Sequence, residues 1–150
     1  MVITLNYNEM LTDIRKDHNI FQRDLATILN VSKSTYARWE TKEQIIPLNH
    51  LNDFCNYFNV SMDYVMNLSR KNNNHIILEK LDKKIIGSNL KKIRKDLSLT
   101  QEDIASLLNT SHSTISAYES GKTLILTSFA YQICQKYNIS MDWLCGRAQN

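Results

Sequence analysis

The chain repeats itself at a spacing of 79 residues, and this internal repeat constrains its fold more than any other feature of the sequence. Shifting residues 11–67 by that distance, without a gap, places Leu11 on Leu90 and Asp63 on Asp142. About 20 of the 57 aligned positions are then identical. Chance does not keep one register over so long a span. We therefore expect two copies of one small domain, at residues 1–68 and 86–150, with a linker at 69–85.

Composition favours helices and argues against a disulfide-bonded or zinc-binding protein. One Pro and three Gly are too few for the many tight turns of an all-β fold. The cysteines Cys55, Cys134 and Cys145 are odd in number and none belongs to a C-x-x-C pair, so we expect buried thiols and no metal site. The formal net charge of +3 permits nucleic-acid binding without arguing strongly for it. Lys and Arg balance Asp and Glu in residues 1–75 (8 to 8) and exceed them in residues 76–150 (10 to 7).

Apolar residues at helical spacing predict five short helices in each copy, and therefore an all-α fold. The expected boundaries in the first copy are Asn6 as N-cap to His18, a start at Gln22, Ser32 as N-cap to Glu40, Pro47 to Phe58, and Ser61 as N-cap of the fifth helix. Ser111 and Ser140 are the matching caps of the second copy.

The linker is expected to be partly helical. Its start is polar, but Ile77, Leu81 and Ile85 recur every fourth residue. This spacing predicts an amphipathic helix that runs into the first helix of the second copy. Its apolar side would pack on a domain of this chain or on another chain.

The second and third predicted helices of each copy have the features of a helix-turn-helix: two short helices, a tight turn, and a small residue, Ala26 or Ala105, where the helices cross. Residues 22–40 read Q-x-x-L-A-x-x-L-N-V-S-x-S-T-x-x-x-W-E, and residues 99–122 read L-T-Q-E-D-I-A-x-x-L-N-T-S-x-S-T-I-x-x-Y-E-S-G-K. These segments resemble the lambda-repressor-like family, also called Cro/XRE. The tails at 59–64 and 138–144 are similar to its fifth helix. The resemblance implies two tandem five-helix domains and covers nearly the whole chain outside the linker.

The resemblance also implies that the third helix of each copy enters the major groove of DNA and contacts base edges with its N-terminal residues. The candidate base contacts are Lys33, Ser34, Ala37 and Arg38 in the first copy and His112, Ser113, Ser116 and Ala117 in the second. Lysine and arginine donate to guanine O6 and N7, whereas the second set is short and nearly uncharged. We expect the copies to read different sequences, or the second copy to read weakly.

Other positions are implied to contact the DNA backbone or to hold the domain together. Gln22 and Gln101 open the second helices, where the family contacts a phosphate and the helix dipole favours an anion. Candidate phosphate contacts after the third helices are Lys42, Lys122 and Thr123. Two pairs, Arg15 with Glu40 and Arg94 with Glu119, are interpreted as structural ion pairs that tie the first helix to the end of the third.

The first copy departs from the family pattern after its third helix. Lys42 stands where the family prefers glycine, and Gly121 has that place in the second copy. Because lysine adopts the left-handed conformation only at a cost, we expect the third helix of the first copy to end differently. Glu43 is expected to face DNA and repel phosphate. The second copy has Leu126 in the place of Pro47.

These features predict a sequence-specific regulator of transcription that binds double-stranded DNA, most simply a repressor. The alternative is a protein-interaction module, antitoxin- or inhibitor-like, that holds a protein partner on a helix-turn-helix surface. A homodimer is open in either case. No phosphate loop, metal-ligand pair or nucleophile motif occurs, so we expect no enzyme activity and no cofactor. No apolar run approaches 18 residues and no signal-peptide pattern opens the chain, so we expect a cytoplasmic protein without a membrane segment.

Overall fold

The computed structural model describes residues 7–149, which form ten helices and no strand. Contacts divide the chain into two compact units, unit 1 at residues 1–77 and unit 2 at residues 78–150. Each unit holds five helices, so the predicted all-α fold with two tandem helix-turn-helix domains is confirmed. None of the described helices has the length and apolar character needed to cross a membrane.

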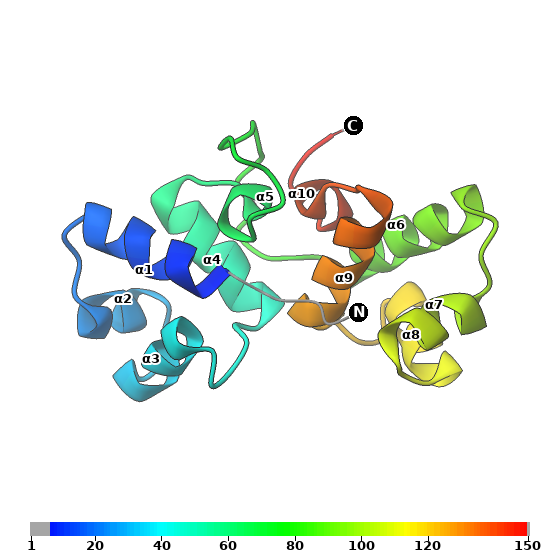
Figure 1. Cartoon of the computed structure of the whole chain (residues 1–150), viewed down its shortest axis with the longest axis horizontal. Coiled ribbons are helices and arrows are strands. Elements are labelled where there is room, and N and C mark those ends of the chain that lie inside the picture. The colour runs from blue at the N-terminus through cyan, green and yellow to red at the C-terminus, as the bar shows by residue number, and fades with distance from the viewer. Residues whose placement is uncertain (1–6, 150) are drawn as a thin grey trace. The chain divides into compact units, whose positions relative to one another are not determined.

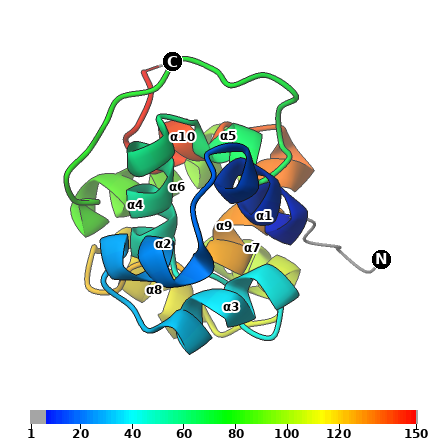
Figure 2. The same cartoon turned by 90° about the vertical axis from the view of Figure 1, so that its left-hand side faces the viewer.

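Unit 1 consists of the first five helices of the chain (Figure 1; Figure 2). They are α1 (Tyr7–Asp17), α2 (Gln22–Ile28), α3 (Lys33–Thr41), α4 (Leu48–Phe58) and α5 (Met62–Val65). Their buried faces meet in one core that includes Leu11 from α1, Leu25 from α2, Trp39 from α3, Phe54 from α4 and Val65 from α5. The core therefore draws on all five helices, as a domain of this size requires.

Unit 2 repeats this order with α6 (Lys83–Asp96), α7 (Gln101–Leu108), α8 (His112–Glu119), α9 (Thr127–Tyr137) and α10 (Met141–Leu144). The corresponding core residues are Leu90, Ile104, Tyr118, Ile133 and Leu144. Cys55, Cys134 and Cys145 are buried and form no disulfide in the described part of the chain. Core burial thus follows the 79-residue repeat even where the apolar side chain differs.

Serine caps mark the helix starts where the sequence indicated them. Ser32 Oγ accepts a hydrogen bond from the backbone nitrogen of Thr35 at 3.1 Å. Ser61, Ser111 and Ser140 cap α5, α8 and α10 in the same way. Pro47 lies at the N-cap position of α4 rather than in its first turn. The cap predicted at Asn6 lies outside the described residues.

The turns repeat as closely as the helices. Left-handed backbone occurs at five pairs of positions 79 residues apart: Asn19 and Ser98, Asn30 and Asn109, Lys42 and Gly121, Asn59 and Asn138, and Asn67 and Gly146. The third helices do end differently, because α3 runs to Thr41 and is capped by Lys42, whereas α8 ends at Glu119 and is capped by Ser120. The expected reason is wrong, since Lys42 adopts φ 68° where Gly121 adopts φ 79°. The surrounding fold imposes the left-handed turn on lysine despite its Cβ.

The predicted linker helix is present only at the end of the linker. Helix appears only from Lys83, and residues 72–82 carry no helix. Asp82 stops helix from extending toward Ile77, because its Oδ1 accepts the backbone N–H of Lys84 at 2.9 Å and so caps α6. Leu81 is buried in unit 2, whereas Ile77 and Ile85 are exposed. The fourth-residue spacing of these three side chains therefore does not make one helical face.

Candidate nucleic-acid interface

The third helix of each unit, α3 or α8, has one buried side and one exposed side. Tyr36 and Trp39 anchor α3 in the core, and Ile115 and Tyr118 anchor α8. Ala26 of α2 is 1% exposed, which is consistent with the expected close crossing of α2 and α3 (Figure 2). The anchored side leaves the N-terminal side chains of α3 and α8 outside the core.

The candidate base contacts lie on that outer side. Six of the eight are exposed, namely Lys33, Ser34, Arg38, His112, Ser113 and Ser116. Ala37 and Ala117 are half-buried. The hydroxyls of Ser34 and Ser113 lie 3.1 and 3.0 Å from the cap hydroxyls of Ser32 and Ser111, so the cap also positions the first exposed side chain of each helix.

A three-residue cluster joins α1, α2 and α3 in unit 1. Arg15 donates from Nε to Glu40 Oε2 at 2.7 Å and from Nη2 to Oε1 at 3.0 Å, a bidentate pair. Arg15 also donates to the carbonyl oxygen of Ile20 at 2.9 Å. Gln22 Nε2 donates to Glu40 Oε1 at 3.0 Å. Both charged side chains are at least nine-tenths buried, at 10% and 6% exposure. The cluster fixes the start of α2 relative to the end of α3.

Unit 2 builds the same cluster. Arg94 donates to the two carboxylate oxygens of Glu119 at 2.7 and 3.0 Å, and Gln101 donates to Glu119 at 3.1 Å. Burial by itself raises the pKa of Glu119, but hydrogen bonds from Arg94 and Gln101 outweigh it and hold the pKa below its ordinary value. The pKa of Glu40 is lowered by the same balance. Both glutamates are therefore held ionised.

The glutamine side chains proposed for phosphate contact are half-buried and already hold one partner. Their amide nitrogens bond to Glu40 and Glu119, so each amide is oriented before any ligand arrives. They lie at the first residues of α2 and α7, where backbone N–H groups have no partner within the helix. This placement suits an anion at the helix start.

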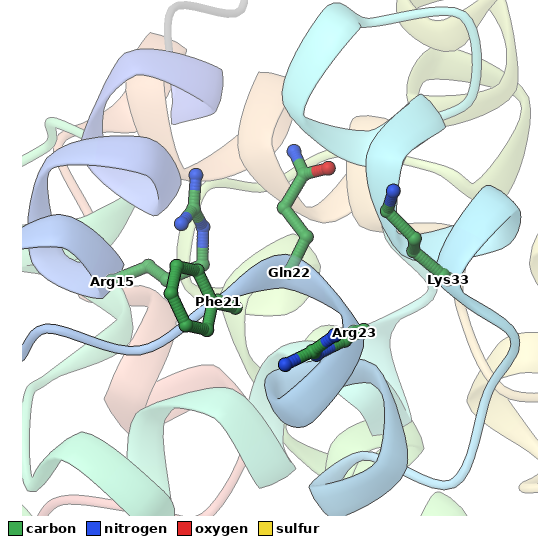
Figure 3. A pocket seen from close by; sticks show the side chains of 5 residues that line it. All are labelled: Arg15, Phe21, Gln22, Arg23 and Lys33. Carbon is green, nitrogen blue, oxygen red and sulfur yellow. The ribbon is translucent and has the colours of Figure 1, made fainter.

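A basic cavity of about 360 Å³ lies in unit 1 beside the start of α2. Figure 3 shows its lining: Arg15 from α1, Phe21 from the preceding turn, Gln22 and Arg23 from α2, and Lys33 from α3. Arg23 stacks on Phe21, with its guanidinium carbon 5.4 Å from the ring centroid. Sequence reasoning missed Arg23 and Phe21, although the position of Arg23 directly after Gln22 at the helix start was a usable signal.

Unit 2 is less basic at the positions that match this lining. Thr100, Glu102 and His112 stand where unit 1 has Phe21, Arg23 and Lys33. Unit 1 thus places two more positive charges at the start of its second and third helices, while unit 2 places a negative one. The units share their framework and differ in what they present at this surface.

In the loops after the third helices, unit 2 is the more basic of the two units. Lys42 is exposed in unit 1. The next residue, Glu43, lies with its Oε2 4.0 Å from Arg38 Nε and partly offsets the charge of Arg38. In unit 2, Lys122 and Thr123 are exposed and Ala117 takes the place of Arg38. The positive groups of unit 1 therefore lie mainly at the helix starts, and those of unit 2 at the loop.

Comparisons with known proteins identify a helix-turn-helix domain in each half of the chain. One helix-turn-helix family model matches residues 11–65, and a second, described as a helix-turn-helix domain, matches residues 87–149. The chain is 39% identical over 62 residues to the antitoxin PezA of Streptococcus pneumoniae, covering 41% of this chain and 39% of that protein. It is 30% identical over 63 residues to YobD of Bacillus subtilis, an uncharacterized HTH-type transcriptional regulator, covering 42% of this chain and 56% of YobD.

Two solved structures are also similar over part of the chain. A transcriptional regulator from Listeria innocua has 29% sequence identity and a TM-score of 0.41, over 43% of this chain and 61% of that one. The clp gene regulator ClgR from C. glutamicum has 21% identity and a TM-score of 0.39, over 44% of this chain and 86% of that one. With a matched family model in each half and a repeated five-helix fold, the chain belongs to the lambda-repressor-like, or Cro/XRE, helix-turn-helix family, in two tandem copies.

Proposed function

We propose that this protein is a cytoplasmic, sequence-specific regulator of transcription that binds double-stranded DNA, acts as a repressor and has no catalytic step of its own. The N-terminal residues of α3 and α8 read base edges in the major groove, and the starts of α2 and α7 hold phosphates. One observation carries the proposal: both third helices are anchored in the core by one side and expose their leading side chains on the other.

The two units make unequal contributions to base recognition. Lys33 and Arg38 of α3 are long donors that suit guanine O6 and N7, and a bidentate arginine contact contributes about 1–3 kcal/mol of base discrimination. His112 and Ser113 of α8 are shorter and carry little charge. Unit 1 therefore supplies most of the sequence specificity, and the preferred site is asymmetric within one chain.

Selection of bound duplexes from a random pool tests the proposal. The wild type is expected to enrich a defined motif at moderate salt. The Lys33→Ala/Arg38→Ala variant should lose preference at the positions that unit 1 reads, whereas His112→Ala/Ser113→Ala should change the motif less. Lys16→Ala/Lys71→Ala, which removes two exposed charges outside these helices, is the matched control. A wild type that enriches no motif contradicts the proposal.

A protein-interaction function is the second candidate, and the 39% identity to an antitoxin over 62 residues is the observation that favours it. In this case a surface of one unit holds a protein partner. Salt dependence separates the two functions, because each phosphate neutralised on DNA adds about −0.9 to the slope of log affinity against log salt. An apolar protein contact shows no such steep slope.

A further inference from the structure

Unit 2 carries a group of lysines that the predicted DNA contacts leave unused. Lys80 precedes α6, and Lys83 and Lys84 form its first turn. All three are exposed, as is Lys122 in the loop after α8. Within residues 7–149, none of these four lysines takes part in an ion pair or hydrogen bond through its ammonium group. Their charges are therefore available to a ligand.

Acidic groups near these lysines do not cancel them. Glu79 and Asp82 lie in the same segment as Lys80, Lys83 and Lys84, so three positive charges accompany two negative ones there, and Lys122 adds a fourth positive charge from the loop after α8. Asp82 is engaged in capping, since its Oδ1 accepts the backbone N–H of Lys84 at 2.9 Å and of Ile85 at 3.4 Å. A carboxylate held at the helix start cannot follow the flexible lysine side chains. The segment keeps a net positive charge toward solvent.

The fold brings the first turn of α6 against the loop that follows α8. A Cβ added to Gly121 would lie 2.8 Å from Cγ and 3.0 Å from Cα of Lys84, so the two backbones touch there. Lys80, Leu81, Asp82, Lys83, Lys84 and Gly121 line a shallow cavity of about 530 Å³. Lys122 follows Gly121 directly, which continues the basic surface into the loop.

We propose that Lys80, Lys83 and Lys84 form, with Lys122, a phosphate-binding surface that holds the backbone of duplex DNA beside the groove entered by α8. This inference rests on the proposed function, because it takes α8 to lie in the major groove. Lysine ammonium groups bind phosphate as point charges and carry no base information. Unit 2 therefore contributes to DNA affinity mainly through contacts with the DNA backbone, because the short side chains of α8 contribute little through contacts with the bases.

The surface is specific to unit 2. Residues 79 positions earlier are Met1, Thr4 and Leu5 in place of the three lysines, and Glu43 in place of Lys122. None of these four can donate to a phosphate as a cation. Residues 76–150 contain ten Lys and Arg residues, and Lys80, Lys83, Lys84 and Lys122 are four of them. The proposed surface therefore accounts for much of the basic excess in the second half of the chain.

The test compares two full-length variants with the same change in charge. The cluster variant carries Lys80→Gln, Lys83→Gln and Lys84→Gln, and glutamine keeps the helix start and the Asp82 cap intact. The control carries Lys92→Gln, Lys95→Gln and Lys136→Gln, which lie in the later part of α6 and in α9. Affinity is measured from low to high salt for the duplex selected by the wild type and for a duplex of random sequence.

The cluster variant is expected to bind both duplexes about tenfold or more weakly at low salt, with a salt slope shallower by up to about 2.7 for three phosphates. Its selected motif should be unchanged, and Lys→Arg at the three positions should restore binding. The control should keep the wild-type slope. Equal salt slopes for the cluster and control variants would overturn the inference. The proposed function would still stand in that case, provided that the wild type binds the selected duplex. A wild type that binds no duplex would instead overturn both.

Discussion

At the scale of single residues, the buried ion pair is the feature on which each unit depends most. Arg15 and Glu40 meet in a bidentate contact with little exposure, and Arg94 and Glu119 repeat it. Removing one partner leaves the other buried without its opposite charge, which costs about 3–5 kcal/mol for a fully buried pair. Loss of DNA binding on mutation here therefore reports unfolding as much as lost contact, and folding must be measured alongside.

The lowered pKa of these glutamates makes stability depend on acid pH. Glu40 has a folded-state pKa below its ordinary value of 4.5, so the unfolded chain takes up the proton first. The stabilisation is complete above about pH 4.5 and is lost as the pH falls through the folded pKa. We expect the free energy of unfolding to decrease below that pH, and less so in Glu40→Gln/Glu119→Gln, as measured by urea unfolding from pH 7 to 3. The same dependence of the free energy of unfolding on pH in wild type and variant would contradict this prediction.

Lys42 offers a stabilising substitution. It holds φ 68° after α3, in the left-handed region where a Cβ costs about 1–2 kcal/mol. Lys42→Gly should therefore raise the free energy of unfolding of unit 1 by about 1 kcal/mol, seen as slower hydrogen exchange in α1–α5. Gly121→Ala is the converse: it should destabilise unit 2, since its Cβ would also meet Lys84. A Lys42→Gly variant no more stable than wild type would show that the turn relaxes around lysine.

At the scale of elements, the second helices of the two units start differently. Thr100 and Asp103 form a reciprocal capping box at α7, with bonds of 3.0 and 2.8 Å between side chain and backbone. Phe21 at the same position of α2 makes no side-chain cap, although Asp24 matches Asp103. Phe21 instead stacks with Arg23 at the basic cavity. Unit 1 thus gives up a cap where it gains a cationic surface.

Phe21→Thr tests this exchange. A restored cap should stabilise unit 1 by about 1 kcal/mol, within the usual range of 0.5–2 kcal/mol, as measured by chemical unfolding. Phe21→Ala, which removes the ring without adding a cap, is the control and should not stabilise. If threonine and alanine have the same effect, then Asp24 and the backbone of α2 are not placed to complete the box. The loss of the ring should also weaken the hold on Arg23 and lower DNA affinity.

At the scale of the whole molecule, the two units share a fold but differ in the residue that packs directly after their fifth helix. Arg147 in unit 2 is fully buried, and its Nε donates to Asp142 Oδ1 at 3.1 Å. Leu68 takes the place of Arg147 in unit 1, while the aspartate is kept as Asp63. An ion pair so deeply buried is costly to break. Unit 2 therefore depends on a charge interaction at a place where unit 1 has an apolar side chain.

Arg147→Ala should lower the free energy of unfolding of unit 2 by about 3–5 kcal/mol, a large part of the stability of so small a domain. Hydrogen exchange should accelerate across α6–α10 and stay unchanged in α1–α5. Leu68→Ala, at the matching position of unit 1, removes no charge and should cost much less. Uniform acceleration in both units would mean that they unfold as one cooperative body rather than as two.

The amino-acid sequence alone determined the repeat, the all-α class, the serine caps and the positions of the third helices, because periodicity and capping are local properties written in neighbouring residues. It also indicated the pairing of Arg15 with Glu40 through the family resemblance. Tertiary packing decided what local patterns do not encode: that Lys42 takes a left-handed turn, that Ile77 and Leu81 lie outside any helix, and that Arg147 is buried. Only the folded chain brings Arg23 beside Lys33, or Lys84 against Gly121, because these neighbours are set by how helices cross.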